Sequence, residues 1–312
     1  MRTRSPNWVV IGESVRGASH FRNGLPNQDS IHHLPMVGGS APIILALSDG
    51  HGSPRCFRSA IGAKVAVATA VEASSHFLTA MRGKSLSVIK DSAERYLSTD
   101  IVKIWSSRVS QDQQENPFTD EELFRLENEA GTSAKELTIT GPNHLLAYGA
   151  TLILVVLTAD FLFCLQLGDG DLLIVTSEKE VRRPLIADPA HIANETNSLC
   201  MPGAQRLFQF SFQAIHDSPP ALILAATDGY SNAFVSNSDF EKVGTDMLEL
   251  YRTEGPDYVR QNLPSWLNAA SENASGDDVT VGMIFRDDST KPWLSFERLR
   301  FKRPIKPARV ES

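Results

Sequence analysis

The segment IILALSDGHGS, residues 43–53, places an aspartate and a histidine at the end of an apolar run. Asp49 and His51 are each followed by a glycine, which lets the backbone of this loop approach other groups closely. A carboxylate and an imidazole in such a loop can bind a metal ion or transfer a proton. A single Asp-Gly pair is usually only a turn, because both residues favour turn conformations. Chemistry at this loop therefore depends on partners elsewhere in the chain.

Three further aspartate motifs repeat this design. Asp169 follows an apolar run in LQLGDGD, and Asp228 follows another in LILAATDGY. Asp277 and Asp278 precede the last apolar run, in SGDDVTVGMI. Strand ends in packed sheets can gather at one edge, where several carboxylates would repel one another unless a cation lay among them. Oxygen ligands of this kind suit magnesium or manganese, so the recurrence predicts a divalent-metal site.

Apolar runs bounded by turn residues predict the strands that would carry these motifs. Helical periodicity and start signals predict the helices, one of which begins with a capping box and one of which is interrupted by a proline. Adjacent strands with helices grouped outside them indicate antiparallel sheets and an α+β fold. The predicted strands are residues 8–14, 41–50, 149–158, 161–177, 206–215, 221–229 and 279–287, the predicted helices are 53–81, 86–110, 119–130 and 257–271, and the predicted loops are 17–30 and 131–147.

The composition excludes several classes of protein. The 312 residues carry a formal net charge of -7, which argues against general nucleic-acid binding because that function needs a basic surface. The longest apolar stretch, TLILVVLTADFLFCLQL, is interrupted by Asp160 and predicts paired strands, not a membrane span. No apolar segment follows the N-terminal arginines, so we expect no signal peptide. Three widely spaced cysteines, Cys56, Cys164 and Cys200, indicate a reducing compartment, and we expect a cytoplasmic protein.

The order of the motifs resembles that of a known enzyme family. ALSDGHGS, YGATLILVV, LGDGD, AATDGYSN and SGDDVTVGMI are similar to the motifs of metal-dependent serine/threonine phosphatases of the 2C type, the PPM family. GESVRGASHFRNGLPNQDS is similar to the N-terminal acidic motif of a bacterial-type branch. The resemblance covers residues 8–287 and implies a four-layer α/β/β/α sandwich with two central antiparallel sheets. We therefore expect a phosphatase domain at residues 1–287 and a basic tail at residues 288–312.

The resemblance also implies a centre of two manganese or magnesium ions, with a third, weaker ion beside it. Asp49 would bridge the first two ions, Asp228 and Asp277 would hold one of them, and Asp169 would bind the third. His51 matches the general acid of the family, so His51 and Asp49 would be the catalytic residues. The metal ligands implied in this way are Asp29, Asp49, Gly50 through its carbonyl, Asp169, Asp228 and Asp277.

Two departures from the family pattern affect the expected site. The family has Glu-Asp where this chain has Gln28-Asp29, and a neutral amide contributes less to a metal ion than a carboxylate does. The family also has an arginine that holds the substrate phosphate, and Gly24 stands at its spacing here. Arg22 or His20 could contact the phosphate instead, and either could equally be an ordinary loop residue.

We predict a phosphoprotein phosphatase that hydrolyses phosphoserine and phosphothreonine with a metal-activated water and no covalent intermediate. His51 would protonate the departing serine or threonine oxygen, which is a poor leaving group as an alkoxide. A second hypothesis is a catalytically weak regulatory or phosphoprotein-binding module. Gln28 and the missing arginine favour it, whereas the retained metal ligands and His51 disfavour it. A third hypothesis is a metal-dependent phosphoesterase for small molecules.

The expected partners follow from this activity. They are a phosphorylated protein substrate and a cognate serine/threonine kinase or its targets, with no nucleic acid and no membrane, and we expect a monomer. Residues 184–205 form a long connector, which is either the family's flap beside the active site or a surface excursion. The tail at residues 291–312 has seven basic and two acidic residues, and it is either disordered or docks to an acidic partner.

Overall fold

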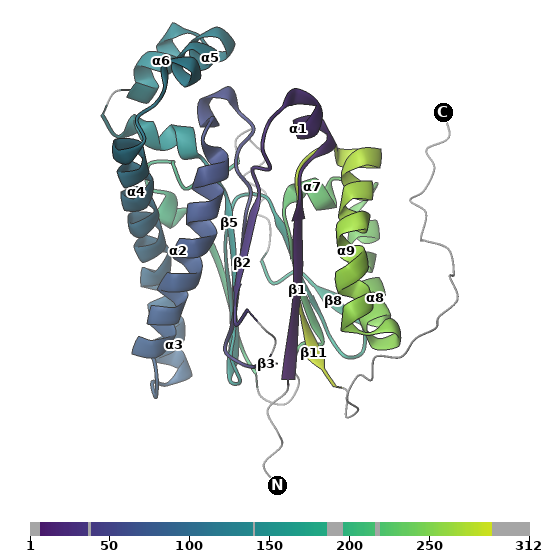
Figure 1. The fold of residues 1–312 in the computed structure, drawn as a ribbon. Coiled ribbons are helices and arrows are strands. Elements are labelled where there is room, and N and C mark those ends of the chain that lie inside the picture. The colour runs from purple at the N-terminus through teal and green to yellow at the C-terminus, as the bar shows by residue number, and fades with distance from the viewer. Residues whose placement is uncertain (1–6, 37–38, 140, 186–195, 216–218, 289–312) are drawn as a thin grey trace.

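Two antiparallel sheets packed face to face form the centre of the molecule (Figure 1). The computed structural model describes residues 7–36, 39–139, 141–185, 196–215 and 219–288. The six-stranded sheet has the order β3-β1-β11-β10-β7-β8, and the five-stranded sheet has the order β2-β4-β5-β6-β9. The strands are β1 (Asn7–Val15), β2 (Ser30–Leu34), β3 (Gly39–Ser40), β4 (Ile43–Ser48), β5 (Leu152–Leu157), β6 (Phe161–Leu167), β7 (Asp171–Val175), β8 (Val181–Arg182), β9 (Gln209–Ala214), β10 (Leu222–Ala226) and β11 (Val279–Asp287).

The central strands are apolar on both faces because both faces are covered. Every residue of β4, β5, β6 and β10 is buried. One face of each sheet packs into the layer between the sheets, where Trp8, Leu45 and Ile223 lie. The other face packs against helices. This explains why the sequence shows continuous apolar runs rather than alternation at these strands.

Helices cover the two outer faces and complete the four expected layers. Apolar side chains of four consecutive elements pack on the five-stranded sheet. These elements are α2 (Ser59–Ala80), α3 (Leu86–Ser92), the π-helical turn η2 (Ala93–Leu97) and α4 (Ser98–Glu115). Those of α8 (Asn237–Glu254) and α9 (Pro256–Ala270) pack on the six-stranded sheet. The remaining helical elements are α1 (Ala18–Asn23), η1 (Pro54–Cys56), α5 (Asp120–Ala130), α6 (Thr132–Ile139), η3 (Gly141–Tyr148), η5 (Ala204–Arg206), α7 (Asp228–Ser231) and η6 (Ser271–Ser275). The expected α/β/β/α sandwich is confirmed.

Several local predictions were wrong. The expected loops contain helices, namely α1 within residues 17–30, and α6 and most of η3 within residues 131–147. The expected strand at 161–177 is two strands, β6 and β7, which lie in different sheets. Helix α8 was not predicted, although its buried Phe240, Val243 and Tyr251 give it an apolar side facing the sheet. Helix α9 continues through Pro264, because its buried Leu263 and Leu267 hold the helix against the sheet on both sides of the proline. The capping box of α5 at Thr119 and Glu122 is confirmed.

The strand directions bring the predicted motifs to one end of the sandwich. Val15 at the end of β1 pairs with Val279 at the start of β11, and Ala226 at the end of β10 pairs with Val281. Among the described residues, no helix combines the length and the apolar character that crossing a membrane requires. The predicted tail lies outside the described residues, apart from its first residue, so the boundary at residue 287 stays a prediction.

Candidate active site

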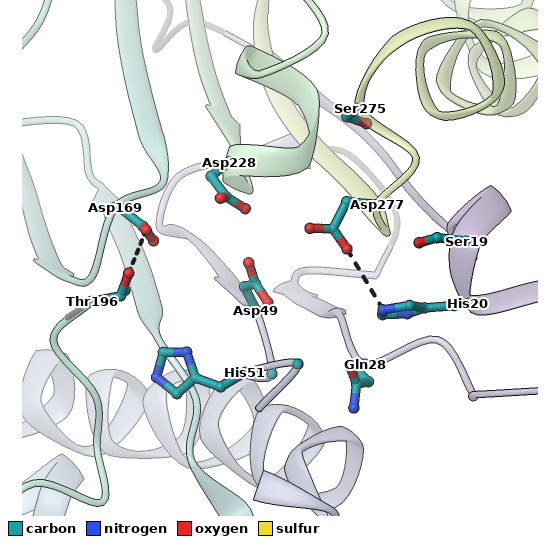
Figure 2. A pocket seen from close by; sticks show the side chains of 12 residues that line it. Ser19, His20, Gln28, Asp49, His51, Asp169, Thr196, Asp228, Ser275 and Asp277 are labelled. Carbon is teal, nitrogen blue, oxygen red and sulfur yellow. Dashed lines mark hydrogen bonds and ion pairs between the residues drawn. The ribbon is translucent and has the colours of Figure 1, made fainter. Parts of the chain in front are cut away.

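A polar pocket opens at this end of the sandwich, with a volume of about 350 Å³ (Figure 2). Its walls come from the segments that follow β1, β4, β6, β8 and β10 or precede β11. Among the described residues, no lysine or arginine lines it. The residues that line it are Ser19, His20, Gln28, Asp49, Gly50, His51, Gly52, Asp169, Thr196, Asp228, Ser275 and Asp277.

The loop after β4 is held by backbone hydrogen bonds to the strand beside it. The backbone N–H of Asp49 donates to the Thr151 hydroxyl (3.0 Å), and the N–H of Thr151 donates to the carbonyl of Asp49 (2.8 Å). The N–H of His51 donates to the carbonyl of Gly149 (3.1 Å). A Cβ at Gly50 would lie 2.7 Å from the carbonyl oxygen of Gln28, so only glycine fits there. These contacts fix the directions of Asp49 and His51.

Burial and mutual repulsion disfavour the charged form of the carboxylates in this pocket. Burial raises the pKa of Asp49 well above its usual range, and the charges of Asp29 and Asp228 raise it further. Burial also raises the pKa of Asp228. Figure 2 shows the carboxylates of Asp49, Asp228 and Asp277 pointing toward one another. A cation between them would stabilise the charged carboxylates and offset the cost of burying these charges together.

The donor set fits a divalent cation. Carboxylate oxygens are the ligands that Mg²⁺ and Mn²⁺ prefer, and Oδ1 of Asp228 is buried with no hydrogen-bond partner among the residues that the structure describes. Within the described residues, no three His, Cys, Asp or Glu side chains surround one point closely enough to hold an ion by themselves. The fit therefore rests on the chemistry of the donors, and one expected donor, the Gly50 carbonyl, belongs to the backbone.

Asp29 lies behind the pocket wall instead of lining it. Its Oδ2 accepts hydrogen bonds from the hydroxyls of Thr227 and Thr280, each at 2.7 Å. Burial raises the pKa of Asp29 to about 8, although these two hydroxyls oppose the shift. Gln28, the neighbouring residue, does line the pocket, and its Oε1 is buried without a partner. The role of Asp29 as a metal ligand stays a prediction.

Asp278 was not predicted as a site residue, but it organises the opposite wall. It is buried, and its two oxygens accept hydrogen bonds from the backbone N–H groups of Gly17 (2.5 Å) and Gln28 (2.6 Å). Nδ1 of His20 lies 2.8 Å from Oδ2 of Asp278, within hydrogen-bonding distance. This clamp holds the His20 ring in the pocket wall, with Nε2 at 3.8 Å from Asp277.

The two candidates for phosphate contact differ in position. His20 lines the pocket, whereas Arg22 is exposed on α1 and is not among the lining residues. Of these two candidates, His20 is the one that lines the pocket, and its contact with a phosphate stays a prediction.

The remaining wall carries His51 and a hydroxyl that the sequence did not single out. Burial lowers the pKa of His51, with opposition from the charge of Asp169. Its Nε2 is buried and has no hydrogen-bond partner in the described part of the chain. The Thr196 hydroxyl donates to Oδ2 of Asp169 at 2.6 Å. Thr196 belongs to the expected flap at residues 184–205, of which residues 186–195 lie outside the described part.

Comparisons with known proteins point to one family. The family model described as "Protein phosphatase 2C" matches residues 16–268, and a search of curated proteins found no match. A bacterial serine phosphatase aligns with a TM-score of 0.54 and 14% identity, over 90% of this chain and 99% of that one. PppA of Pseudomonas aeruginosa aligns with a TM-score of 0.54 and 15% identity, over 89% and 97%. The catalytic domain of the serine threonine protein phosphatase PstP, in complex with two manganese ions, aligns with a TM-score of 0.48 and 17% identity, over 89% and 98%.

Proposed function

Because this chain belongs to the protein phosphatase 2C family of serine/threonine phosphatases, we propose that its acidic pocket hydrolyses phosphoserine and phosphothreonine in proteins with two divalent cations. The observation that carries the proposal is the meeting of Asp49 and Asp228, whose pKa values are raised, with the unpartnered Nε2 of His51 in one pocket. The same acidic walls would repel a phosphate dianion unless cations lay between them.

The residues that would hold the ions come from five parts of the chain. Bound manganese or magnesium would supply an activated water and would neutralise the charge of the phosphate. Asp49 would contact both ions, and Asp169 would hold a third, weaker ion. The full proposed ligand set is Asp29, Asp49, the carbonyl of Gly50, Asp169, Asp228 and Asp277.

His51 would donate a proton to the departing serine or threonine oxygen. Its pKa is lowered by burial, so the ring is a ready proton donor once it is charged. An incoming phosphate dianion beside the ring favours the charged form, because opposite charges stabilise each other in a buried site. Binding of the substrate would therefore favour protonation of His51, the general acid that the reaction needs.

His20 would hold the phosphate from the other wall. Asp278 fixes its Nδ1, so Nε2 is the ring nitrogen that remains for a phosphate oxygen. We prefer His20 to the exposed Arg22 for this role. The alternative of a catalytically weak module is not favoured, because a protein that only binds phosphoproteins needs neither buried acidic ligands nor a proton donor.

The wider setting of the enzyme stays part of the proposal. Its substrate would be a phosphoprotein, and a cognate kinase or its targets would be partners. The free cysteines Cys56, Cys164 and Cys200 suit a reducing, cytoplasmic setting. The monomeric state stays a prediction.

The test compares two leaving groups at saturating manganese. A serine or threonine alkoxide needs a proton to leave, whereas nitrophenolate leaves without one. His51→Ala should slow a phosphothreonine peptide by about 10²–10⁴-fold and p-nitrophenyl phosphate far less. Asp49→Asn should slow both substrates alike. Equal losses on the two substrates for His51→Ala would overturn the role of His51, and turnover of nucleotides in preference to the peptide would overturn the substrate class.

A further inference from the structure

A pair of helices projects from the active-site end of the molecule. Helices α5 and α6, joined at Gly131, lie beyond α4 and outside the layers of the sandwich (Figure 1). We call residues 116–139 the helical arm. Leu126 of α5 and Ala134 and Thr138 of α6 are buried in it. The arm therefore packs its inner sides together and leaves its outer sides free for contacts.

The arm is fastened to the loop that carries His51. Arg58 is buried seven residues after His51, and its guanidinium donates to both carboxylate oxygens of Glu122, each at 2.8 Å. It also donates to the carbonyls of Asn116 (2.6 Å) and Pro117 (3.1 Å). The hydrogen bonds to Glu122 raise the pKa of Arg58, so its charge is permanent.

Aromatic contacts and the strand beside the pocket strengthen this anchor. The Arg58 guanidinium lies 4.8 Å from the ring centroid of Phe118, and Phe57 meets Phe118 edge-on at 5.1 Å. Arg58 also donates to the Tyr148 hydroxyl (2.9 Å), next to Gly149, whose carbonyl accepts from His51. The position of the arm relative to the pocket is thus fixed by a buried, fully bonded arginine.

The arm exposes two large apolar side chains. Phe124 of α5 is 63% exposed and Ile139 of α6 is 54% exposed, although neither belongs to the pocket. Gly131 joins α5 to α6, and the two residues lie seven and eight positions from it along the chain, on opposite sides of the turn. Two exposed apolar side chains of this size on a helical projection offer a partner apolar surface to cover.

The charges around these side chains select the partner. Asp120 and Glu121 lie one helical turn before Phe124, and Glu136 lies one turn before Ile139. All three are exposed and form no ion pair within the described residues, whereas Glu127 and Glu129 of the arm pair with Lys135 and Arg125. The free charges of the arm are therefore negative and lie beside its apolar residues.

We propose that the helical arm is a docking surface for a segment of the phosphoprotein substrate that is rich in lysine or arginine and carries large apolar side chains. This inference rests on the proposed function. The basic groups of the segment would meet Asp120, Glu121 and Glu136, and its apolar side chains would cover Phe124 and Ile139. The rigid anchor at Arg58 would keep the docked segment at a constant distance from the pocket, so that the phosphorylated residue reaches it.

The experiment uses phosphothreonine peptides in which a basic, apolar segment stands at increasing distances from the phosphothreonine. Each has a partner peptide in which that segment is replaced by serine and glycine. At the best spacing, kcat/KM should favour the basic peptide by about tenfold, mostly through KM, and the preference should shrink with added salt. Phe124→Ala and the pair Asp120→Asn with Glu121→Gln should each remove most of it. Hydrolysis of p-nitrophenyl phosphate should not change.

Controls separate the arm from exposed residues in general. Tyr96 is 60% exposed on η2, and Asp91 is exposed on α3, so Tyr96→Ala and Asp91→Asn should keep the preference. A preference that survives all arm variants, or is lost equally in the controls, would overturn the proposal. So would loss of p-nitrophenyl phosphate hydrolysis in Phe124→Ala, because the arm would then belong to the catalytic body.

Two other occupants of the surface would also overturn it. Tighter peptide binding after deletion of residues 289–312 would identify the chain's own basic tail as the occupant. A fall in molecular mass after Phe124→Ala, measured by sedimentation, would identify a second copy of the chain. If no phosphatase activity were found at all, the proposed function would fail, but fluorescence anisotropy of the same labelled peptides would still measure docking separately.

Discussion

The carboxylates at the end of the sandwich fall into two groups that differ in what they contact. Asp278 is buried but accepts hydrogen bonds from two backbone N–H groups and lies beside the His20 ring. Asp49 and Asp228 are buried with other carboxylates around them, and burial raises the pKa of each. Asp277, the direct neighbour of Asp278, faces this second group (Figure 2).

The difference shows how two adjacent aspartates can have opposite roles. A buried carboxylate with several N–H donors stabilises the fold, because the donors replace the water it has lost. A buried carboxylate among other carboxylates destabilises the fold until a cation binds. We infer that Asp278 is a structural clamp and that Asp49, Asp228 and Asp277 form a site for cations.

The largest expected effect is on activity, at the centre of the second group. Asp49→Asn should reduce hydrolysis of a phosphothreonine peptide and of p-nitrophenyl phosphate by about 10³-fold or more, because a charge that holds the cations is lost. Steady-state kinetics across a manganese titration would measure this. Activity restored to the wild-type level by high manganese would show that Asp49 contributes only to affinity.

The clamp should give the next largest effect, and on stability. Asp278→Ala leaves the N–H groups of Gly17 and Gln28 without their acceptor, which should lower the free energy of unfolding by about 2–5 kcal/mol. Asp278→Asn keeps an acceptor oxygen and should lose less. Urea denaturation of the metal-free proteins would measure both. Unchanged stability in Asp278→Ala would remove the distinction between the two groups.

The opposite sign is expected for a member of the second group. Asp228→Asn removes a like charge from the pocket, so the free energy of unfolding of the metal-free protein should stay constant or rise by about 1 kcal/mol. The same variant should lose most of its stabilisation by manganese. A loss of stability comparable to that of Asp278→Ala would show that Asp228 is bonded as a structural residue.

The pH dependence of stability should also reflect Asp29, a buried carboxylate outside both groups. Folding raises the pKa of Asp29 from 3.8 to about 8, so the folded protein binds this proton more tightly than the unfolded chain does. The stabilisation is complete below pH 3.8 and is lost as the pH rises toward 8. Melting temperatures of the metal-free protein should therefore fall across this range, and Asp29→Asn should flatten the slope. A melting temperature that rises with pH in the wild type alone would contradict this sign.

The smallest effect is expected at Gln28, where the two groups meet. Its backbone N–H donates to Asp278, while its side chain lines the acidic pocket. Gln28→Glu would add a carboxylate to the cation site, so the manganese concentration for half-maximal activity should fall, roughly threefold to tenfold. An unchanged or higher concentration would show that this side chain does not face the ions.

The sequence predicted the second group better than the first, for a physical reason. Asp49, Asp169 and Asp228 each follow a strongly apolar run, and that pattern is local. The contacts of Asp278 join residues more than 240 positions apart, and no local pattern contains them. The sequence does show a second carboxylate directly after Asp277, and this pair could have indicated a separate role for Asp278.

The same distinction explains the errors in the fold. The strands β4 and β5 were predicted because their apolar runs are continuous, whereas the short strands β2, β3 and β8, which lack such runs, were not. Helix α6 depends on packing against α5, and its own mixed sequence, with buried Ala134 and Thr138, carries no strong apolar periodicity. Helix α8 did carry a local signal, since Ser236 caps it and Phe240 and Val243 are buried one turn apart. Its mostly polar sequence concealed that signal.

The most direct test of the central claim is titration calorimetry with manganese on four metal-free proteins at one pH. The wild type should bind two ions, Asp49→Asn and Asp228→Asn should each lose most of the affinity for at least one of them, and Asp278→Asn should still bind both. Unchanged manganese affinity in Asp49→Asn and Asp228→Asn, or loss of binding in Asp278→Asn alone, would contradict the division of these carboxylates into a cation site and a structural clamp.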